Sequence, residues 1–142
     1  MLVVAVAVLR GGRVLAAQRS YPPELVGQWE FPGGKAHDGE DERDAAVREC
    51  AEELGVVVHV DGRLGADART AAGHSLHLWS ATLVSGEPEP REHRALRWLS
   101  PDELGGVPWI AADLPLVAAV DARLRGAASG YVEARPTSEV PP

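Results

Sequence analysis

The chain has 142 residues, 45% of them hydrophobic, which is enough for one compact core and short of the length at which chains usually divide into domains. Its 14 Lys and Arg against 21 Asp and Glu give a net charge of −7, which argues against a partner that is a nucleic-acid polymer or an anionic membrane. The single cysteine, Cys50, excludes an intramolecular disulfide and indicates a reducing, cytoplasmic environment.

The N-terminal segment is predicted to form a β-hairpin. Residues 2–9 are a short, continuous and largely β-branched run, typical of a strand buried on both faces and far below the roughly 20 residues that a membrane span needs. No basic segment precedes this run, so it does not resemble a signal peptide either. Gly11 and Gly12 separate it from a second apolar run at residues 14–18, which we expect to pair with it.

A loop, a short strand and a glycine turn follow. Two prolines predict a loop at residues 21–24, and residues 27–31 then form a strand on which Trp29 and Phe31 share one face opposite Glu30. The Pro-Gly-Gly sequence at residues 32–34 predicts a turn that ends this strand, because glycine tolerates positive φ and lets the backbone approach a ligand closely.

Residues 40–54 carry the clearest helical pattern in the chain. Small apolar residues recur at helical spacing, charged residues fill the other positions, and Gly55 stands where the left-handed residue that ends a helix belongs. Beyond it, residues 56–60 predict a strand, residues 61–73 a polar connection, and residues 74–84 a longer alternating strand.

The C-terminal part is predicted to combine one strand with two helices. Residues 95–99 form the strand, Ser100 begins a helix with Pro101 at its first position, and a last helix runs from about Asp113 to about Arg125. The composition then shifts to Ala, Ser, Gly, Pro and Glu. Residues 126–142 are therefore expected to be a disordered tail after a single domain at residues 1–125.

Three carboxylates share one face of the predicted helix. Glu49, Glu52 and Glu53 stand at i, i+3 and i+4, where like charges repel. One interpretation is a solvated acidic face on which Arg48 pairs with Glu52. The other is a cation site, since Mg²⁺ prefers hard oxygen ligands and shares its shell with substrate phosphates. The upstream glycine turn favours the cation site, because it can present backbone carbonyls to the same metal.

This cluster belongs to a longer motif. The segment from Gly34 to Val56 resembles the Nudix box, G-x5-E-x7-R-E-U-x-E-E-x-G-U, in which U is a bulky aliphatic residue. The matching residues are Gly34, Glu40, Arg48, Glu49, Glu52, Glu53, Gly55 and Val56. Cys50 is the one departure, at the first U, where a small buried hydrophobe should keep the packing.

The resemblance implies a fold, a chemistry and a set of ligands. The Nudix fold is an α/β/α sandwich with a mixed β-sheet, and the family uses metal-assisted attack of water on a pyrophosphate linkage. The matching positions imply Glu49 and Glu53 as metal ligands, with Glu52 beside them and the Gly33 carbonyl completing the set. Arg48 would orient Glu49, and Glu40 would brace the loop against the helix.

Segments outside the box resemble the MutT-like branch of the family, particularly its CTP pyrophosphohydrolase and 8-oxo-dGTP diphosphatase types. This resemblance implies that Arg19 holds a phosphate, for which a guanidinium is well shaped, although a Gln-Arg pair can equally close an ordinary strand. Lys35, in the matching segment after Trp29, is expected to contact the substrate. Glu92 would join the metal or assist the water, and the alternative is a solvated loop charge.

Asp113 matches the position that contacts the base in the MutT-like branch. That position is Asn in the 8-oxoguanine type and Asp in the cytosine type. An ionised Asp only accepts hydrogen bonds, so it suits the cytosine amine and fits guanine O6 poorly. The alternative is a helix N-cap, which an Asp at the start of a helix performs anyway.

Aromatic and histidine side chains complete the candidate substrate site. Trp29 or Trp109 is expected to stack on a base, with Phe31 nearby, although most buried aromatic side chains are simply core. His74 and His77 stand at i and i+3 on a predicted strand and so face opposite sides, which excludes a chelating pair. His77 is expected to line the base pocket.

The sequence thus predicts a cytoplasmic, Mg²⁺-dependent enzyme, with Mn²⁺ as the alternative metal. It would convert CTP, dCTP or a modified cytosine nucleotide into the monophosphate and pyrophosphate. One alternative is an 8-oxo-dGTP diphosphatase of the same chemistry. Another is a non-catalytic Nudix regulator that binds a nucleotide as a signal, against which the complete set of box carboxylates argues. The expected partner is a small nucleotide, without nucleic-acid polymer or membrane, and the expected assembly is a monomer or a homodimer.

Overall fold

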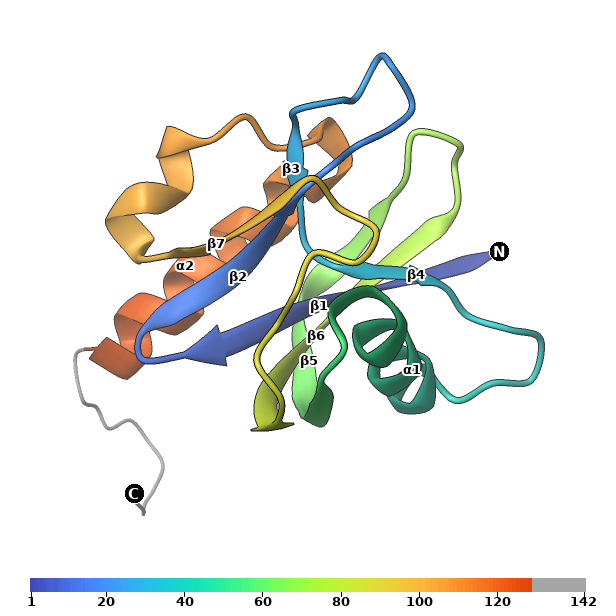
Figure 1. Cartoon of the computed structure of the whole chain (residues 1–142), viewed down its shortest axis with the longest axis horizontal. Helices are drawn as coiled ribbons and strands as arrows, with labels where there is room; N and C mark the ends of the chain where they lie inside the picture. The colour runs from blue at the N-terminus through green and yellow to red at the C-terminus, as the bar shows by residue number, and fades with distance from the viewer. Residues whose placement is uncertain (129–142) are drawn as a thin grey trace.

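A computed structural model describes residues 1–128, in which one mixed sheet lies between two helices (Figure 1). The strands are β1 (Leu2–Arg10), β2 (Arg13–Gln18), β3 (Trp29–Glu30), β4 (Gly33–Lys35), β5 (Val57–Arg69), β6 (Ser75–Ser85) and β7 (Ala95–Leu99). The helices are α1 (Glu42–Leu54) and α2 (Leu114–Ala128), and two 3₁₀ segments are η1 (Pro101–Gly106) and η2 (Ala111–Asp113).

The sheet has the strand order β3-β2-β1-β6-β5, with β4 paired to β1 and β7 paired to β2. Strands β1 and β6 run parallel, and the other pairs are antiparallel. The predicted hairpin is confirmed by the register of β1 and β2, in which Leu9 lies opposite Val14. The predicted α/β sandwich with a mixed sheet is confirmed as well.

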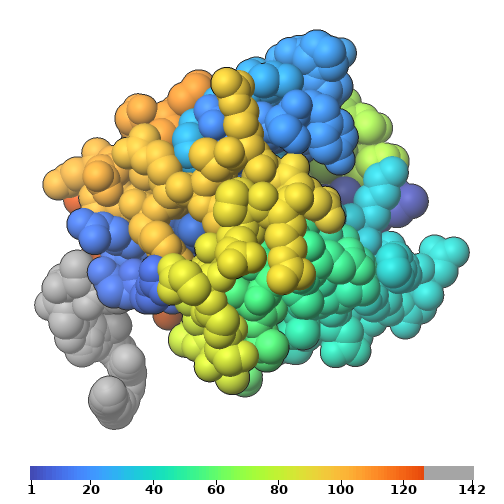
Figure 2. All heavy atoms as spheres, viewed as in Figure 1, coloured from blue at the N-terminus to red at the C-terminus, as the bar shows by residue number. Residues whose placement is uncertain are grey.

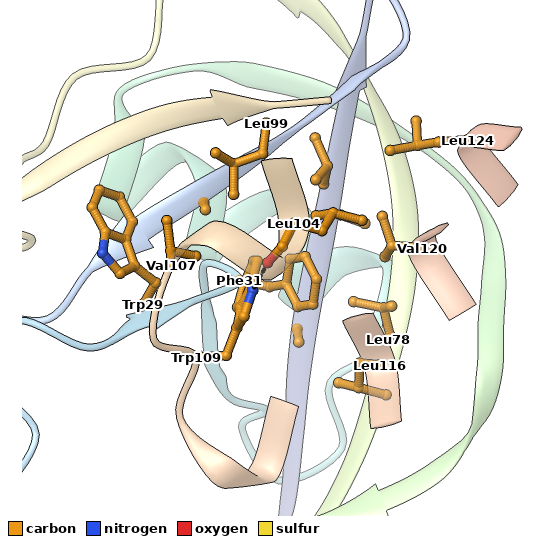
Figure 3. Packing of buried hydrophobic residues seen from close by; sticks show 14 of the residues in the cluster. Trp29, Phe31, Leu78, Leu99, Leu104, Val107, Trp109, Leu116, Val120 and Leu124 are labelled. Carbon is orange, nitrogen blue, oxygen red and sulfur yellow. Dashed lines mark hydrogen bonds between the residues drawn. The ribbon is translucent and has the colours of Figure 1, made fainter. Parts of the chain in front are cut away.

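Strand β1 is buried on both faces, as its continuous apolar sequence predicts. Val4, Val6 and Val8 point into the core under α1, where they pack with Cys50 and Leu54. Ala5 and Ala7 point into the core on the other face, which contains side chains of α2 and of the aromatic cluster shown in Figure 3. The two helices therefore cover opposite faces of the sheet.

The turn predicted at residues 32–34 is confirmed in part: β3 ends before Pro32 and Gly33 has positive φ, but Gly33–Lys35 then forms strand β4 against β1. A side chain at Gly33, where φ is +150°, would place its Cβ 2.0 Å from the Val4 carbonyl oxygen. The glycine is therefore required by close approach to a neighbouring strand.

The polar connection predicted at residues 61–73 is also largely wrong, since β5 continues to Arg69. Register shifts between Val60 and Gly62 and between Leu64 and Ala68 interrupt the alternation of buried and exposed residues. Local periodicity in the sequence therefore does not predict this part of the strand.

The helices agree more closely with prediction. Helix α1 begins at Glu42, two residues later than expected, after the N-cap Asp41, and it ends at the left-handed Gly55. Helix α2 continues three residues past the expected end at Arg125. The rest of the predicted tail, residues 129–142, lies outside the described residues. Within residues 1–128, no helix combines the length and apolar character needed to cross a membrane.

Candidate active site

A pocket of about 1100 Å³ extends from α1 across β4 to η2 and the turn between β5 and β6. It brings together most of the predicted site residues, namely Arg19, Phe31, Gly33, Lys35, Arg48, Glu49, Glu52, Glu53, Glu92 and Asp113. Carboxylates dominate the end at α1, and the other end is lined by the segment that contains Asp113.

Local sequence signals fix the orientation of α1. The Asp41 side chain caps its first turn by accepting hydrogen bonds from the backbone N–H groups of Arg43 and Asp44. At the other end, Gly55 has φ of 72°, and its N–H group donates to the Ala51 carbonyl. Because the small apolar face packs on the sheet, Glu49 and Glu53 are directed to the sheet edge at β4, where both are buried.

The backbone of β4 receives these two carboxylates. Glu53 Oε1 accepts a hydrogen bond from the Gly33 N–H group at 3.2 Å. A Cβ added at Gly34 would lie 2.5 Å from Glu49 Oε2, so a side chain there would displace that carboxylate. The consecutive glycines thus allow two buried carboxylates to lie against one stretch of backbone.

A charged network holds Glu49 from the other side. Arg48 makes a two-pronged ion pair with Glu40, at 2.9 and 3.0 Å, and its Nη1 donates to Glu49 Oε2 at 3.0 Å. Glu40 Oε1 also accepts the N–H group of His37 in the preceding loop. The hydrogen bond from Arg48 lowers the pKa of Glu40 to about 2. These are the contacts expected if Arg48 orients Glu49 and Glu40 braces the loop.

Glu52 differs from its two neighbours. Its side chain is 53% exposed and accepts a hydrogen bond from Arg48 Nη1 at 3.2 Å. The solvated ion pair considered for the acidic face therefore describes Glu52, whereas Glu49 and Glu53 are buried in the pocket wall.

The electrostatics of Glu53 suit a bound cation. Burial raises the pKa of this carboxyl group well above its usual range, and the nearby charges of Glu49, Glu30 and Glu92 raise it further. Within residues 1–128, no three His, Cys, Asp or Glu side chains already take the geometry of a metal centre. Glu49 and Glu53 nonetheless supply hard carboxylate oxygens close to further acidic side chains, and such oxygens fit Mg²⁺ or Mn²⁺ better than a soft metal.

The loop before β7 carries Glu92 into the pocket. In Figure 2 this yellow segment crosses the surface between α1, in green, and the N-terminal part of the chain, in blue. The N–H group of Arg91 donates to the Glu53 carbonyl, that of Arg94 donates to the Gln18 carbonyl, and Ser20 Oγ donates to the Glu92 carbonyl. The backbone around Glu92 is therefore anchored on both sides of the pocket.

Asp113 lies at the opposite end of the pocket. Asp113 is 3% exposed, and its Oδ2 accepts a hydrogen bond from the Phe31 N–H group at 2.9 Å. Burial raises the pKa of its carboxyl group to about 7, with a further contribution from the charge of Glu30. The side chain therefore ties the start of α2 to the end of β3, a long-range contact that a simple helix cap would not make.

The sequence did not predict Glu30 or His93 as site residues. Glu30 lies between Arg19, whose Nη1 is 2.7 Å from Oε1, and His93, whose Nε2 is 2.8 Å from Oε2. All three side chains line the pocket. The usable signal was that Trp29 and Phe31 face the core, which leaves Glu30 on the other face of the strand.

The prediction that Trp29 or Trp109 stacks on a base is wrong, because both side chains belong to the core (Figure 3). Trp109 packs against Phe31 with ring centroids 4.8 Å apart, and its Nε1 donates to the Leu104 carbonyl at 2.7 Å. Neither tryptophan lines the pocket, whereas Phe31 borders it.

The prediction that His77 lines the pocket is wrong as well. Its Nδ1 lies 2.9 Å from Glu42 Oε1, and its Nε2 lies 3.3 Å from Asp67 Oδ2, so both ring nitrogens are occupied elsewhere. Alternation explains the error, since Leu76 on β6 and His74 just before it line the pocket, whereas His77 points the other way.

Comparison with known proteins gives consistent matches over most of the chain. The NUDIX domain model matches residues 1–119. A Mycobacterium tuberculosis protein named putative 8-oxo-dGTP diphosphatase 2 is 46% identical over 131 residues, which cover 90% of this chain and 93% of that protein. The Escherichia coli CTP pyrophosphohydrolase is 40% identical over 119 residues, which cover 82% of this chain and 88% of that protein.

Two solved structures agree with these matches. The solution structure of the E. coli ORF135 protein has a TM-score of 0.75 at 37% identity, covering 92% of this chain and 94% of that one. A structure of MutT from Aliivibrio salmonicida or Vibrio cholerae has a TM-score of 0.70 at 26% identity, covering 85% and 95% of the two chains.

Proposed function

Because the chain belongs to the NUDIX family, we propose that it is a pyrophosphohydrolase that splits a nucleoside triphosphate into the monophosphate and pyrophosphate. The observation that carries this proposal is the pair of buried carboxylates, Glu49 and Glu53, held between the glycines of β4 and the Arg48–Glu40 ion pair. Two buried carboxylates are unfavourable without a cation. The pocket beside them supplies room for a nucleotide.

We infer that Mg²⁺ is the cofactor, with Mn²⁺ as the alternative. Glu49 and Glu53 would hold it, with the exposed Glu52 and Glu92 beside them and the Gly33 carbonyl completing the set. Such an ion lowers the pKa of a bound water and neutralises phosphate charge.

The chain's own residues have separate tasks around this centre. Arg48 keeps Glu49 directed at the pocket, and Glu40 fixes Arg48 in turn. Arg19 and Lys35 also line the pocket, and these cationic side chains would hold phosphates of the substrate. Glu92 has a side chain without a hydrogen bond in the described part of the chain, so its carboxylate is available to the metal or to the proton of the attacking water.

The proposed substrate is CTP, dCTP or a modified cytosine nucleotide. Asp113 presents a carboxyl group at the far end of the pocket, and its ionised form would accept a hydrogen bond from the cytosine amine. The name of the E. coli relative, a CTP pyrophosphohydrolase, supports this choice.

An 8-oxo-dGTP diphosphatase is the second candidate. Its support comes from burial, which raises the pKa of Asp113 to about 7, so that near neutral pH the carboxyl group is also present as a hydrogen-bond donor. A protonated Asp offers a donor and an acceptor, as Asn does, and can therefore meet a guanine edge. The name of the mycobacterial relative is consistent with this candidate.

The test is Mg²⁺-dependent pyrophosphate release from CTP, dCTP, 5-methyl-dCTP, 8-oxo-dGTP and ADP-ribose at several pH values. We expect cytosine nucleotides to have the highest kcat/KM, and their advantage over 8-oxo-dGTP to grow as pH rises through 7. Inert cytosine nucleotides beside a good 8-oxo-dGTP substrate would select the second candidate. Nucleotide binding without turnover of any compound would indicate a regulator.

We place the catalytic domain at residues 1–125 and the protein in the cytoplasm, as a monomer or a homodimer. The net charge of −7 supports a small, metal-bound nucleotide as the ligand, since a polyanion or an anionic membrane would be repelled. Sedimentation of the purified protein with and without tRNA tests both the assembly and the absence of a polymer partner.

A further inference from the structure

Three side chains outside the Nudix box form a chain of contacts across the pocket. Arg19, directly after β2, donates from Nη1 to Glu30 Oε1 at 2.7 Å and from Nε to the Tyr21 carbonyl at 3.0 Å. His93 Nε2 lies 2.8 Å from the other oxygen of Glu30, Oε2. A carboxylate can only accept hydrogen bonds, so the His93 proton lies on Nε2.

The sharing of Glu30 has a geometric consequence for Arg19. A guanidinium and a free carboxylate favour two parallel hydrogen bonds, which are stronger than a single one. Here Arg19 contacts only Oε1 of Glu30, and Oε2 is directed at His93. Within residues 1–128, Arg19 Nη2 makes no hydrogen bond, although the residue lines the pocket.

The environment of His93 indicates that packing alone does not explain why a histidine stands at this position. Its side chain is 6% exposed, yet its second ring nitrogen, Nδ1, is buried without a hydrogen-bond partner in the described structure. An unpaired buried polar atom is unfavourable, and an apolar residue of similar size would avoid it. The contact from Nε2 to Glu30 is the interaction that such a residue would lose.

We propose that His93 is a positioning residue that competes with Arg19 for Glu30 and so keeps one edge of the Arg19 guanidinium free for a nucleotide phosphate. Without His93, Glu30 would turn both oxygens to Arg19 and withdraw it from the pocket. This inference rests on the proposed function, because it needs a phosphorylated ligand in the same pocket.

The test is a double-mutant cycle on nucleotide binding. The probe is α,β-methylene-CTP with Mg²⁺, which cannot be cleaved between its α and β phosphates, and its Kd is measured by calorimetry. We expect His93→Leu to raise Kd about tenfold, the loss of one charge-assisted contact, and Arg19→Ala to raise it at least as much. In the Arg19→Ala background, His93→Leu should change Kd less than about twofold, because the group on which it acts is gone.

Two further variants separate this role from a structural one. His93→Gln keeps an N–H donor that can reach Glu30, so its Kd should return toward that of the wild type. His59→Leu is the matched control, since that exposed histidine lies on β5 and contacts Asp61. Thermal melting of each variant confirms folding before Kd is measured.

Each result has a distinct meaning. Equal Kd values for the wild type and His93→Leu, or additive losses in the cycle, would overturn the inference and leave the proposed function standing. A wild-type protein that binds no nucleotide and releases no pyrophosphate would refute the proposed function and the inference with it.

Discussion

Replacing Asp113 by Asn tests the buried carboxyl group at the far end of the pocket. Burial raises its pKa from the ordinary value of 3.8 to about 7. Below the ordinary value the group is protonated in the folded and the unfolded chain, so the free energy of unfolding is not reduced by this group. Between 3.8 and 7 the unfolded chain releases the proton while the folded chain keeps it, so the folded state loses stability as pH rises.

The magnitude follows from the pKa difference. Each pKa unit corresponds to about 1.4 kcal/mol, so this group lowers the free energy of unfolding by about 4 kcal/mol once the pH exceeds the folded pKa. Asn cannot ionise, and its Oδ1 can still accept the Phe31 N–H group. The Asp113→Asn variant should therefore lack this decline, and its stability relative to the wild type should rise by about 4 kcal/mol between pH 4 and 8.

Urea denaturation at half-unit steps of pH measures this difference in metal-free buffer. Asp38→Asn is the matched control, because Asp38 is exposed in the loop before α1. Parallel pH profiles for the wild type and Asp113→Asn would refute the reasoning from burial. The same variant should shift substrate preference toward 8-oxo-dGTP. An unchanged ranking of substrates would limit Asp113 to a structural role through its hydrogen bond with Phe31.

Three further predictions concern the carboxylate end of the pocket and the helix that carries it. Glu53→Gln should lower Mg²⁺-dependent turnover by at least about a hundredfold. The same variant should melt at a higher temperature in EDTA, because burial raises the pKa of Glu53 and the wild type must take up a proton on folding, which Gln does not; equal turnover would contradict its role. Glu40→Gln should lower kcat about tenfold by releasing Arg48. Because the pKa of Glu40 is about 2, the wild-type Glu40–Arg48 pair should persist at every pH above 4.5, and a step in the stability profile assigned to Glu40 in that range would argue otherwise. Gly55→Ala should destabilise the fold by about 1–2 kcal/mol through its left-handed backbone, whereas Gly105→Ala, with open space and ordinary φ, should not.

Local sequence was sufficient to predict the helix and the acidic cluster of the site. Helix α1 is specified by its own cap, its small apolar face and Gly55, all within a few residues of one another. The same spacing placed Glu49 and Glu53 together, and the structure buries both. Spacing alone does not predict burial, since Glu52 has an equivalent spacing and is exposed.

The features that the sequence did not reveal depend on distant partners. Strand β4 forms because its residues pair with β1. Strand β5 continues to Arg69 because it pairs with β6 beyond the register shifts at residues 60–62 and 64–68. Glu30 and His93 are 63 residues apart in sequence, and no periodicity brings them together. The side of β6 on which His77 lies is likewise set by sheet register.

The most direct test of the central claim is the product pattern, followed by ³¹P NMR, when CTP and Mg²⁺ are added to the wild type and to Glu53→Gln. The account predicts CMP and pyrophosphate from the wild type, no reaction without Mg²⁺, and almost none with Glu53→Gln. CDP and inorganic phosphate as products, or equal turnover by the two proteins, would contradict it.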